Sequence, residues 1–296
     1  MLISLAFIWG ASFYFIEIGL IYLNPFWLVS LRLLFGALPL ALWLLFQGKT
    51  LPTKLCFWTS VMIMGVLNNF LPFNFIAFGQ LYVTGGMASI VNANTAFMGV
   101  IVSGLFLSGE PATWNRVVGV MIGVTGVAVA IGITPMLPAA DANNLLLGSL
   151  AIIVATIAYA FAGVWGKIKL AEYSPTQSAV GMLICSSVIS VLCSFFISGR
   201  PSLEIINHPF DLIKVVLGLG VLGTALAYPL YFKILEVAGS SNLMLVTIIV
   251  PVFAIILDAI LLSQFVTGSD LFGFALVAIG LFIMDGRLNH NLLRKG

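Results

Sequence analysis

Glu17 and Arg32 carry opposite charges inside apolar stretches of the 296-residue chain, and they are the strongest candidates for chemistry. A charge within a membrane-spanning helix costs about 2.5–3.5 kcal/mol on insertion scales, so each side chain needs a partner or a water-filled cavity. Both stand at similar distances from the turn at Asn24-Pro25, which predicts similar depths on two antiparallel helices. We therefore expect an intramembrane ion pair that holds this hairpin. The alternative is a coupling role, in which Glu17 binds a proton or the amino group of a substrate.

Asp258 is a third acid, near the end of another apolar stretch. A long or flexible polar side chain close to the membrane surface can extend to the polar interface while its stem stays among apolar groups. The carboxylate of Asp258 is therefore expected at the membrane interface.

Neutral polar residues are concentrated in two apolar stretches, one with Asn68, Asn69 and Asn74, the other with Asn92 and Asn94. Amides that faced lipid would lack hydrogen-bond partners, so they must face protein or water. Bonding between helices explains each amide singly, whereas a hydrated cavity with aromatic walls explains the group. Such a cavity favours a neutral or zwitterionic solute. The predicted substrate-binding residues are Trp9, Ser12, Asn69, Asn74, Gln80, Asn92, Asn94, Tyr159, Trp165, Tyr228 and Thr247.

Catalytic residues, metal sites and cofactors are not expected. His208 and His290 both fall in connecting segments, and no apolar stretch holds two acids, which argues against an intramembrane enzyme. The 3 cysteines are expected to be small core residues. The sequence has no phosphate-binding Gly-x-x-x-x-Gly-Lys-Ser/Thr loop, which excludes direct use of ATP by this chain.

The elements that position these residues follow from the composition, which is 61% hydrophobic and 7% charged. Soluble domains have about 45–50% apolar and about 25% charged residues. The mean hydropathy of +1.17 agrees with this difference. The composition excludes a soluble enzyme, a nucleic-acid binder and a disordered protein. It predicts an all-α integral membrane protein that is embedded in the lipid bilayer.

Apolar windows of membrane-spanning length, about 20 residues each, number ten. Polar residues, glycines and prolines separate them, as at Asn24-Pro25 and Gly239–Ser241. The predicted spans are 2–22, 26–47, 55–80, 86–108, 114–133, 145–166, 176–198, 212–234, 241–262 and 269–286.

The positions of the cations predict the orientation of these spans. Cytoplasmic loops of membrane proteins carry an excess of Lys and Arg. With the N-terminus inside, only Arg200 and Lys214 fall on the outer side. Both termini are therefore expected in the cytoplasm, with the chain in the cell inner membrane. The cations on the cytoplasmic side are Lys49, Lys54, Arg116, Lys167, Lys169, Lys233, Arg287, Arg294 and Lys295.

An internal repeat accounts for the even number of spans. A shift of 154 residues aligns Gly85 with Gly239 and Gly119 with Gly273. The chain therefore divides into two five-helix repeats, residues 1–140 and 141–296, integrated in one membrane domain. Because five is odd, the second repeat enters the membrane from the opposite side. Inverted repeats of this kind are common in secondary transporters, where they support alternating access.

Several motifs resemble the drug/metabolite transporter superfamily, in its ten-helix EamA-type branch. They are Trp9-Gly10-Ala11-Ser12-Phe13, Arg32, and Leu-Ser-Gly-Glu-Pro-Ala-Thr at 107–113. The second half repeats the last pattern at Leu262–Thr267, with Gln264 where the family usually has Glu. The resemblance implies a secondary transporter of small metabolites, including amino acids and aromatic amino acids, often directed outward.

The leading hypothesis is thus an amino-acid exporter that works by alternating access through a central cavity. A carrier of drugs or other metabolites and a proton-coupled uptake transporter are the alternatives. A channel fits less well, because neither rings of charge nor repeated carbonyl loops are visible. The glycine pair Gly119 and Gly123 could pack helices within one chain or between two, so the protein is expected to be a monomer or a homodimer.

Overall fold

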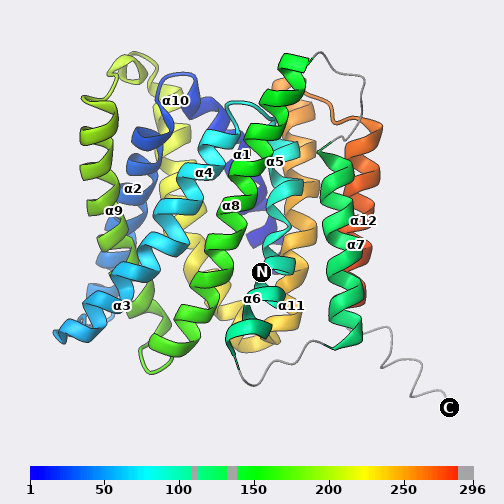
Figure 1. Cartoon of the computed structure of the whole chain (residues 1–296). Coiled ribbons are helices and arrows are strands. Elements are labelled where there is room, and N and C mark those ends of the chain that lie inside the picture. The colour runs from blue at the N-terminus through cyan, green and yellow to red at the C-terminus, as the bar shows by residue number, and fades with distance from the viewer. Residues whose placement is uncertain (108–112, 132–138, 286–296) are drawn as a thin grey trace.

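The computed structural model describes residues 1–107, 113–131 and 139–285, and every regular element in these ranges is a helix (Figure 1). Within these ranges, eight helical stretches are long and apolar enough to cross a membrane, and two shorter apolar helices accompany them. Large apolar side chains such as Phe46, Phe196 and Phe210 are exposed on the outside, as expected for a surface that contacts lipid.

The first part of the chain begins with two uninterrupted helices. The next stretch changes from α-helix to a short π-helical segment and back, and the following one is divided into two helices. These elements are α1 (Leu2–Leu20), α2 (Pro25–Phe46), α3 (Leu55–Gly65), the π-helical η1 (Val66–Phe70), α4 (Leu71–Gly79), α5 (Gly85–Asn92), α6 (Thr95–Phe106) and α7 (Trp114–Ala130).

The second part contains two further π-helical segments. Its elements are α8 (Ala139–Lys169), α9 (Pro175–Ser198), the 3₁₀-helical η2 (Glu204–Asn207), α10 (Pro209–Ile213), the π-helical η3 (Lys214–Leu226), α11 (Ala227–Leu257), the π-helical η4 (Asp258–Leu262) and α12 (Gly268–Asp285).

Each predicted span overlaps an apolar helix, but two boundaries differ from the prediction. The expected break at Gly239–Ser241 lies within α11, because small residues do not by themselves end a helix in an apolar environment. The expected continuous span 86–108 is interrupted between Asn92 and Thr95, where Thr95 Oγ1 donates to the Asn92 carbonyl at 2.7 Å. This side-chain bond competes with the backbone ladder of the helix.

α2, α5 and α9 each begin at a side chain that accepts a bond from the first turn of the helix. Asn24 accepts from Trp27 N, Thr84 from Met87 N and Ser174 from Gln177 N. Prolines occupy the first helical position of α2 and α9, where their missing N–H removes no helical bond. The turns predicted before these helices therefore result from local sequence, namely a capping side chain and, for α2 and α9, a proline.

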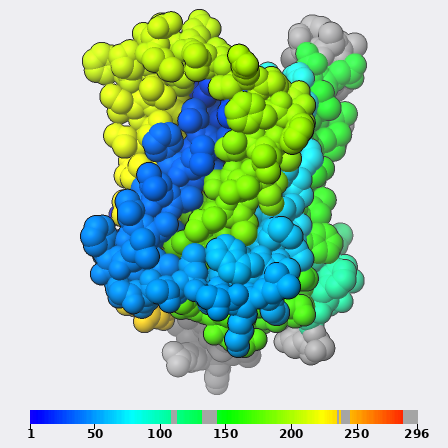
Figure 2. Space-filling model, turned by 90° about the vertical axis from the view of Figure 1, so that its left-hand side faces the viewer, coloured from blue at the N-terminus to red at the C-terminus, as the bar shows by residue number. Residues whose placement is uncertain are grey.

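Helices from the first part of the chain pack mainly against helices from the second part. Helices that follow one another in sequence make fewer contacts. α1 contacts α11 and η3, whereas α2 contacts α9 and η3. Figure 2 shows α2 in blue crossing one face between the yellow η3 and the yellow-green α9. Ser30 Oγ bonds to Ser190 Oγ at 2.9 Å and to Ser194 Oγ at 2.8 Å, which joins α2 to α9 in the interior.

α7 and α12 form the closest helix pair and lie together at one side of the bundle (Figure 1). A Cβ atom added at Gly119 would lie 2.6 Å from the carbonyl oxygen of Gly280, and one at Gly126 would lie 2.7 Å from that of Gly273. The glycine motif therefore packs helices within this chain.

Candidate functional site

Arg32 lies in the interior, seven residues after the start of α2, and is only 8% exposed. Its Nε donates to Thr224 Oγ1 of η3 at 3.2 Å. Its guanidinium carbon lies 3.8 Å from the centroid of the Phe73 ring of α4. A cation over an aromatic face gains electrostatic stabilisation, most when water is excluded. The charge is thus held by three helices without reaching the membrane surface.

Glycines allow the backbones around Arg32 to approach closely. A Cβ at Gly36 would lie 2.6 Å from Thr224 Cγ2, and one at Gly223 would lie 2.7 Å from Ser12 Oγ. The same added atom at Gly223 would be 3.9 Å from Arg32 Nη2. α1, α2 and η3 therefore meet beside the guanidinium group.

A chain of hydrogen bonds runs through the amides next to this point. Asn68 Nδ2 donates to Tyr228 Oη at 3.0 Å, and Tyr228 Oη donates to Asn69 Oδ1 at 2.8 Å. Asn69 Nδ2 then donates to Ser186 Oγ at 3.1 Å. Both asparagines lie in η1, and π-helical turns often occur at functional sites. These bonds link η1, α9 and α11.

Two tyrosines complete the surroundings of Arg32. The hydroxyl groups of Tyr159 and Tyr228 are close enough for electrostatic interaction with its guanidinium group. Both side chains are half-buried, so part of their surface remains accessible. We call the whole group the central cluster; its members are Ser12, Arg32, Asn68, Asn69, Phe73, Tyr159, Ser186, Thr224 and Tyr228.

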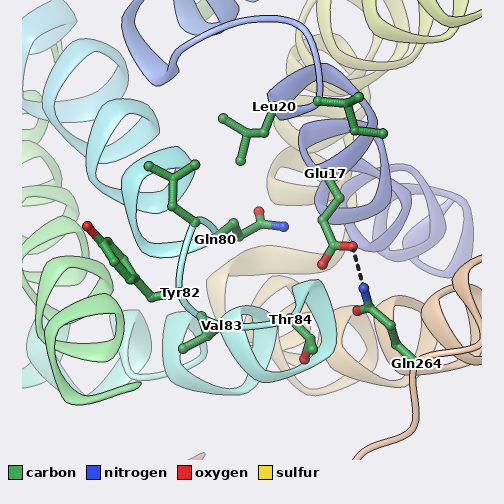
Figure 3. A pocket seen from close by; sticks show the side chains of 9 residues that line it. Glu17, Leu20, Gln80, Tyr82, Val83, Thr84 and Gln264 are labelled. Carbon is green, nitrogen blue, oxygen red and sulfur yellow. Dashed lines mark hydrogen bonds between the residues drawn. The ribbon is translucent and has the colours of Figure 1, made fainter. Parts of the chain in front are cut away.

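A second polar group surrounds the N-terminus of α5. The backbone N–H of Gly85 donates to Glu17 Oε1 at 2.5 Å, and that of Gly86 donates to Asp258 Oδ2 at 2.5 Å. Gln264 Nε2 donates to Glu17 Oε2 at 3.2 Å (Figure 3). Unpaired N–H groups and the positive dipole end of a helix both stabilise carboxylates. We call these five residues the α5 junction.

A cavity of about 420 Å³ lies beside the α5 junction. Figure 3 shows Glu17 and Gln264 on one side of it and the chain between α4 and α5 on the other. Gln80 also borders it, and its Nε2 donates to the Phe13 carbonyl at 3.0 Å. The lining residues are Glu17, Leu20, Ile21, Gln80, Leu81, Tyr82, Val83, Thr84 and Gln264.

The predicted ion pair between Glu17 and Arg32 is not formed in this structure, although both residues lie in its described part. Glu17 bonds to the α5 junction and Arg32 to Thr224 and Phe73. The prediction assumed that α1 and α2 pack along each other, whereas each packs mainly against helices of the second half. The expectation for Asp258 was also wrong: it is 2% exposed, because it is directed at the backbone of Gly86.

The other predicted binding residues divide between the two sites and their surroundings. Ser12, Asn69, Tyr159 and Tyr228 belong to the central cluster, and Gln80 to the cavity beside the α5 junction. The other six predicted residues are outside the central cluster and do not line this cavity.

Three of those residues have identified contacts with neighbouring helices. The ring of Trp9 is 5.9 Å from that of Tyr231, centroid to centroid. Asn94 Nδ2 donates to Thr156 Oγ1 at 3.3 Å. Trp165 Nε1 donates to the Ser60 carbonyl at 3.0 Å.

The remaining three predicted residues are Asn74, Asn92 and Thr247. Asn74 Nδ2, on α4, donates to the carbonyl of Phe70 at the end of the adjoining η1 at 2.7 Å. Asn92 ends α5 and is half-buried, and Thr247 is half-buried on α11. The family-like motif at 107–113 falls mostly outside the described residues, which exclude 108–112.

Phe73 and Ser186 are site residues that the sequence did not single out, and Gly85 was noted only for its place in the internal repeat. A phenylalanine or serine is common in apolar helices, so residue type carried no signal. Gln264 was noted only as a departure from a motif, and its bond to Glu17 follows from the fold. The sequence shows which residues are charged or polar. It does not show which helices pack together and so which residues become partners.

Comparisons with known proteins give the family context of these sites. The EamA-like transporter family matches residues 1–132 and 146–284. An uncharacterized transporter, YoaV, of Bacillus subtilis is 24% identical over 282 residues, which is 95% of this chain and 94% of the relative. A probable amino-acid metabolite efflux pump of Salmonella typhimurium is 26% identical over 285 residues, or 93% and 90% of the two chains.

The fold also has a counterpart among solved structures. One crystal structure superposes with a TM-score of 0.69 at 19% identity and covers 98% of this chain and 96% of its own. At this identity the likeness concerns the arrangement of helices alone.

Proposed function

Since this chain belongs to the EamA-like transporter family, we propose that it carries small organic metabolites, and amino acids in particular, outward across the cell inner membrane. The multi-pass membrane architecture and the transporter relatives support a carrier rather than an enzyme. The Salmonella typhimurium relative, named a probable amino-acid metabolite efflux pump, supports the substrate class and the direction. Carriers of other metabolites or drugs remain the alternative within the same family.

The observation that carries this proposal is the central cluster. It gathers charged, amide, phenolic and hydroxyl groups from α1, α2, η1, α8, α9, η3 and α11 in the interior of a protein whose outer surface is apolar. Polar groups are costly within a membrane unless they are paired or line a hydrated path. In our proposal a small solute binds here, between the two halves of the chain.

We propose that two five-helix halves form an inverted repeat and give alternating access at this site. The family match falls into two pieces, 1–132 and 146–284, which agree with the two halves proposed from the sequence. The shift of 154 residues that aligns the halves moves η1 onto residues 220–224, which lie within η3. Corresponding π-helical turns would then face the central cluster from both halves.

The α5 junction has the position of a gate. With both termini in the cytoplasm, the end of α1 and the start of α5 lie toward the outer face. Glu17, Asp258 and Gln264 hold three helical segments together there. In our proposal these bonds close the outer path in the present conformation and break when the carrier opens outward. The bilayer is the only other partner we propose, with the chain as a monomer or a homodimer and without nucleic acid.

A proton-coupled carrier is a second candidate, and one observation favours it. Two carboxylates, Glu17 and Asp258, bond to adjacent backbone N–H groups. Like charges held this close repel each other, so a proton bound between them relieves the repulsion. Movement of that proton could accompany the opening of the gate.

Exchange in proteoliposomes tests the proposed function. Vesicles that hold the purified full-length protein are loaded with one unlabelled amino acid at a time and exposed to the same labelled compound. A carrier gives saturable counterflow, in which label accumulates transiently against its gradient, whereas a channel gives none. Absence of counterflow for every amino acid in the panel would contradict the proposed substrate class.

A further inference from the structure

Arg32 has far fewer partners than a buried guanidinium group normally has. Its five N–H donors can be satisfied by a carboxylate together with other acceptors. Within the described part of the chain it has one hydrogen-bond partner, Thr224, and one aromatic contact, Phe73. The groups that interact electrostatically with it are the phenols of Tyr159 and Tyr228, and no described carboxylate does so.

The unpaired donors of Arg32 are not completely sealed from the surface. Some buried side-chain atoms in the described residues are both sealed from solvent and unpaired, for example Asn74 Oδ1 and Asn94 Oδ1. The two Nη nitrogens are not in that state, although neither has a hydrogen-bond partner in the described residues. They therefore keep a small exposed surface, in line with the 8% exposure of the whole residue.

The free energy of an unpaired charge in this position argues against a purely structural role. A buried ion pair with one partner missing leaves an uncompensated charge, which is strongly destabilising. Arg32 also lies about 10 Å along α2 from its first residue, at the rise of 1.5 Å per residue, and is 8% exposed. Such a residue in a membrane protein marks a binding site or an ion pathway.

We infer that Arg32 binds the carboxylate group of the transported solute. The planar guanidinium group can donate two parallel bonds from its two Nη nitrogens to a carboxylate, while Nε keeps its bond to Thr224. The partly exposed rings of Tyr159 and Tyr228 would then lie beside the rest of the molecule. This inference rests on the proposed function and narrows it to solutes that carry a carboxylate, such as amino acids in zwitterionic form.

The same counterflow assay tests this inference. An amino acid that the wild-type protein exchanges is compared with its amide derivative, which keeps the amino group and side chain but lacks the carboxylate. Arg32→Gln removes the cation and Arg32→Lys keeps it without the bidentate geometry. Lys214→Gln is the matched control, because Lys214 is a partly exposed cation that pairs with Asp211 on the adjacent turn.

We expect the wild-type protein and Lys214→Gln to prefer the acid over the amide by about tenfold or more, because charge-assisted bonds to a carboxylate have no equivalent in the amide. Arg32→Gln should exchange both compounds at similar rates, and Arg32→Lys should keep part of the preference. An unchanged preference in Arg32→Gln would overturn the inference while leaving the proposed function intact.

Two further outcomes are distinguishable. If Arg32→Gln fails to fold, the wild-type comparison decides, because a wild-type protein that exchanges the amide as fast as the acid contradicts the inference. If the wild-type protein exchanges no amino acid, the proposed function fails first and the inference fails with it.

Discussion

Glu17 and Asp258 meet at one helix end: the first accepts a hydrogen bond from Gly85 N–H and the second from the adjacent Gly86 N–H. One carboxylate comes from the first helix of the chain and the other from η4, so residues far apart in sequence stabilise the same turn of α5. A single short helix therefore depends on contacts from both halves of the protein.

Replacing Asp258 by alanine should destabilise the fold. The substitution leaves the buried Gly86 N–H without its acceptor, which costs about 1–3 kcal/mol. Thermal unfolding in detergent should show a lower midpoint for Asp258→Ala. Glu204→Gln, a change at an exposed acid, serves as control and should leave the midpoint unchanged. Equal midpoints for both variants would mean that the bond to Gly86 does not stabilise α5.

Replacing Glu17 by glutamine tests proton coupling. The amide oxygen of the new glutamine can still accept a bond from Gly85 N–H, so the variant should fold. The amide group does not take up a proton near neutral pH. If the gate binds a proton, a pH gradient should change the exchange rate of the wild-type protein and leave that of Glu17→Gln unaffected. The same response to the gradient in both proteins would remove Glu17 from any coupling role.

Adding one methyl group at Gly126 should destabilise the α7–α12 pair. The new Cβ would lie 2.7 Å from the carbonyl oxygen of Gly273, and such overpacking costs about 1–3 kcal/mol. Gly163→Ala is the matched control, because an added Cβ there meets no atom within 4 Å. That variant should gain up to about 1 kcal/mol from the higher helix propensity of alanine. Opposite shifts of the unfolding midpoint are the expected result, and equal shifts would contradict the close approach of the helices.

Removing the hydroxyl group of Tyr228 should interrupt the chain of bonds in the central cluster. Asn69 Oδ1 keeps a bond from Asn68 Nδ2 at 3.2 Å, so the loss of stability in Tyr228→Phe should be modest, about 0.5–1.5 kcal/mol. Exchange in proteoliposomes should slow more than this loss of stability explains. Tyr14→Phe, at a half-buried residue of α1 outside the cluster, should exchange like the wild type. Normal exchange by Tyr228→Phe would show that the phenol is only a packing group.

The apolar stretches and their turns could be predicted from the sequence, because hydrophobic length and capping residues act locally. Asn24-Pro25 and Ser174-Pro175 begin α2 and α9 as expected. Polar residues inside apolar stretches also indicated the central cluster, since such residues are rare without a reason.

The partners of these residues could not be predicted in the same way. Neighbours in sequence were assumed to be neighbours in space, which paired Glu17 with Arg32. In the structure α1 packs on α11 and α2 on α9, so the two charges face different helices. Which helices meet depends on surface shape, for example at Gly36 and Gly223, and no local pattern reveals it.

The close contact of α7 with α12 limits where the protein can bend. Their backbones approach closely at Gly119, Gly126, Gly273 and Gly280, which have no side chain that could change rotamer and absorb a displacement. We therefore expect the two helices to move together as one rigid unit. If the two halves rock against each other as we propose, we expect them to pivot about this helix pair. The largest displacements should then fall at the opposite edge, where serine hydroxyls join α2 to α9.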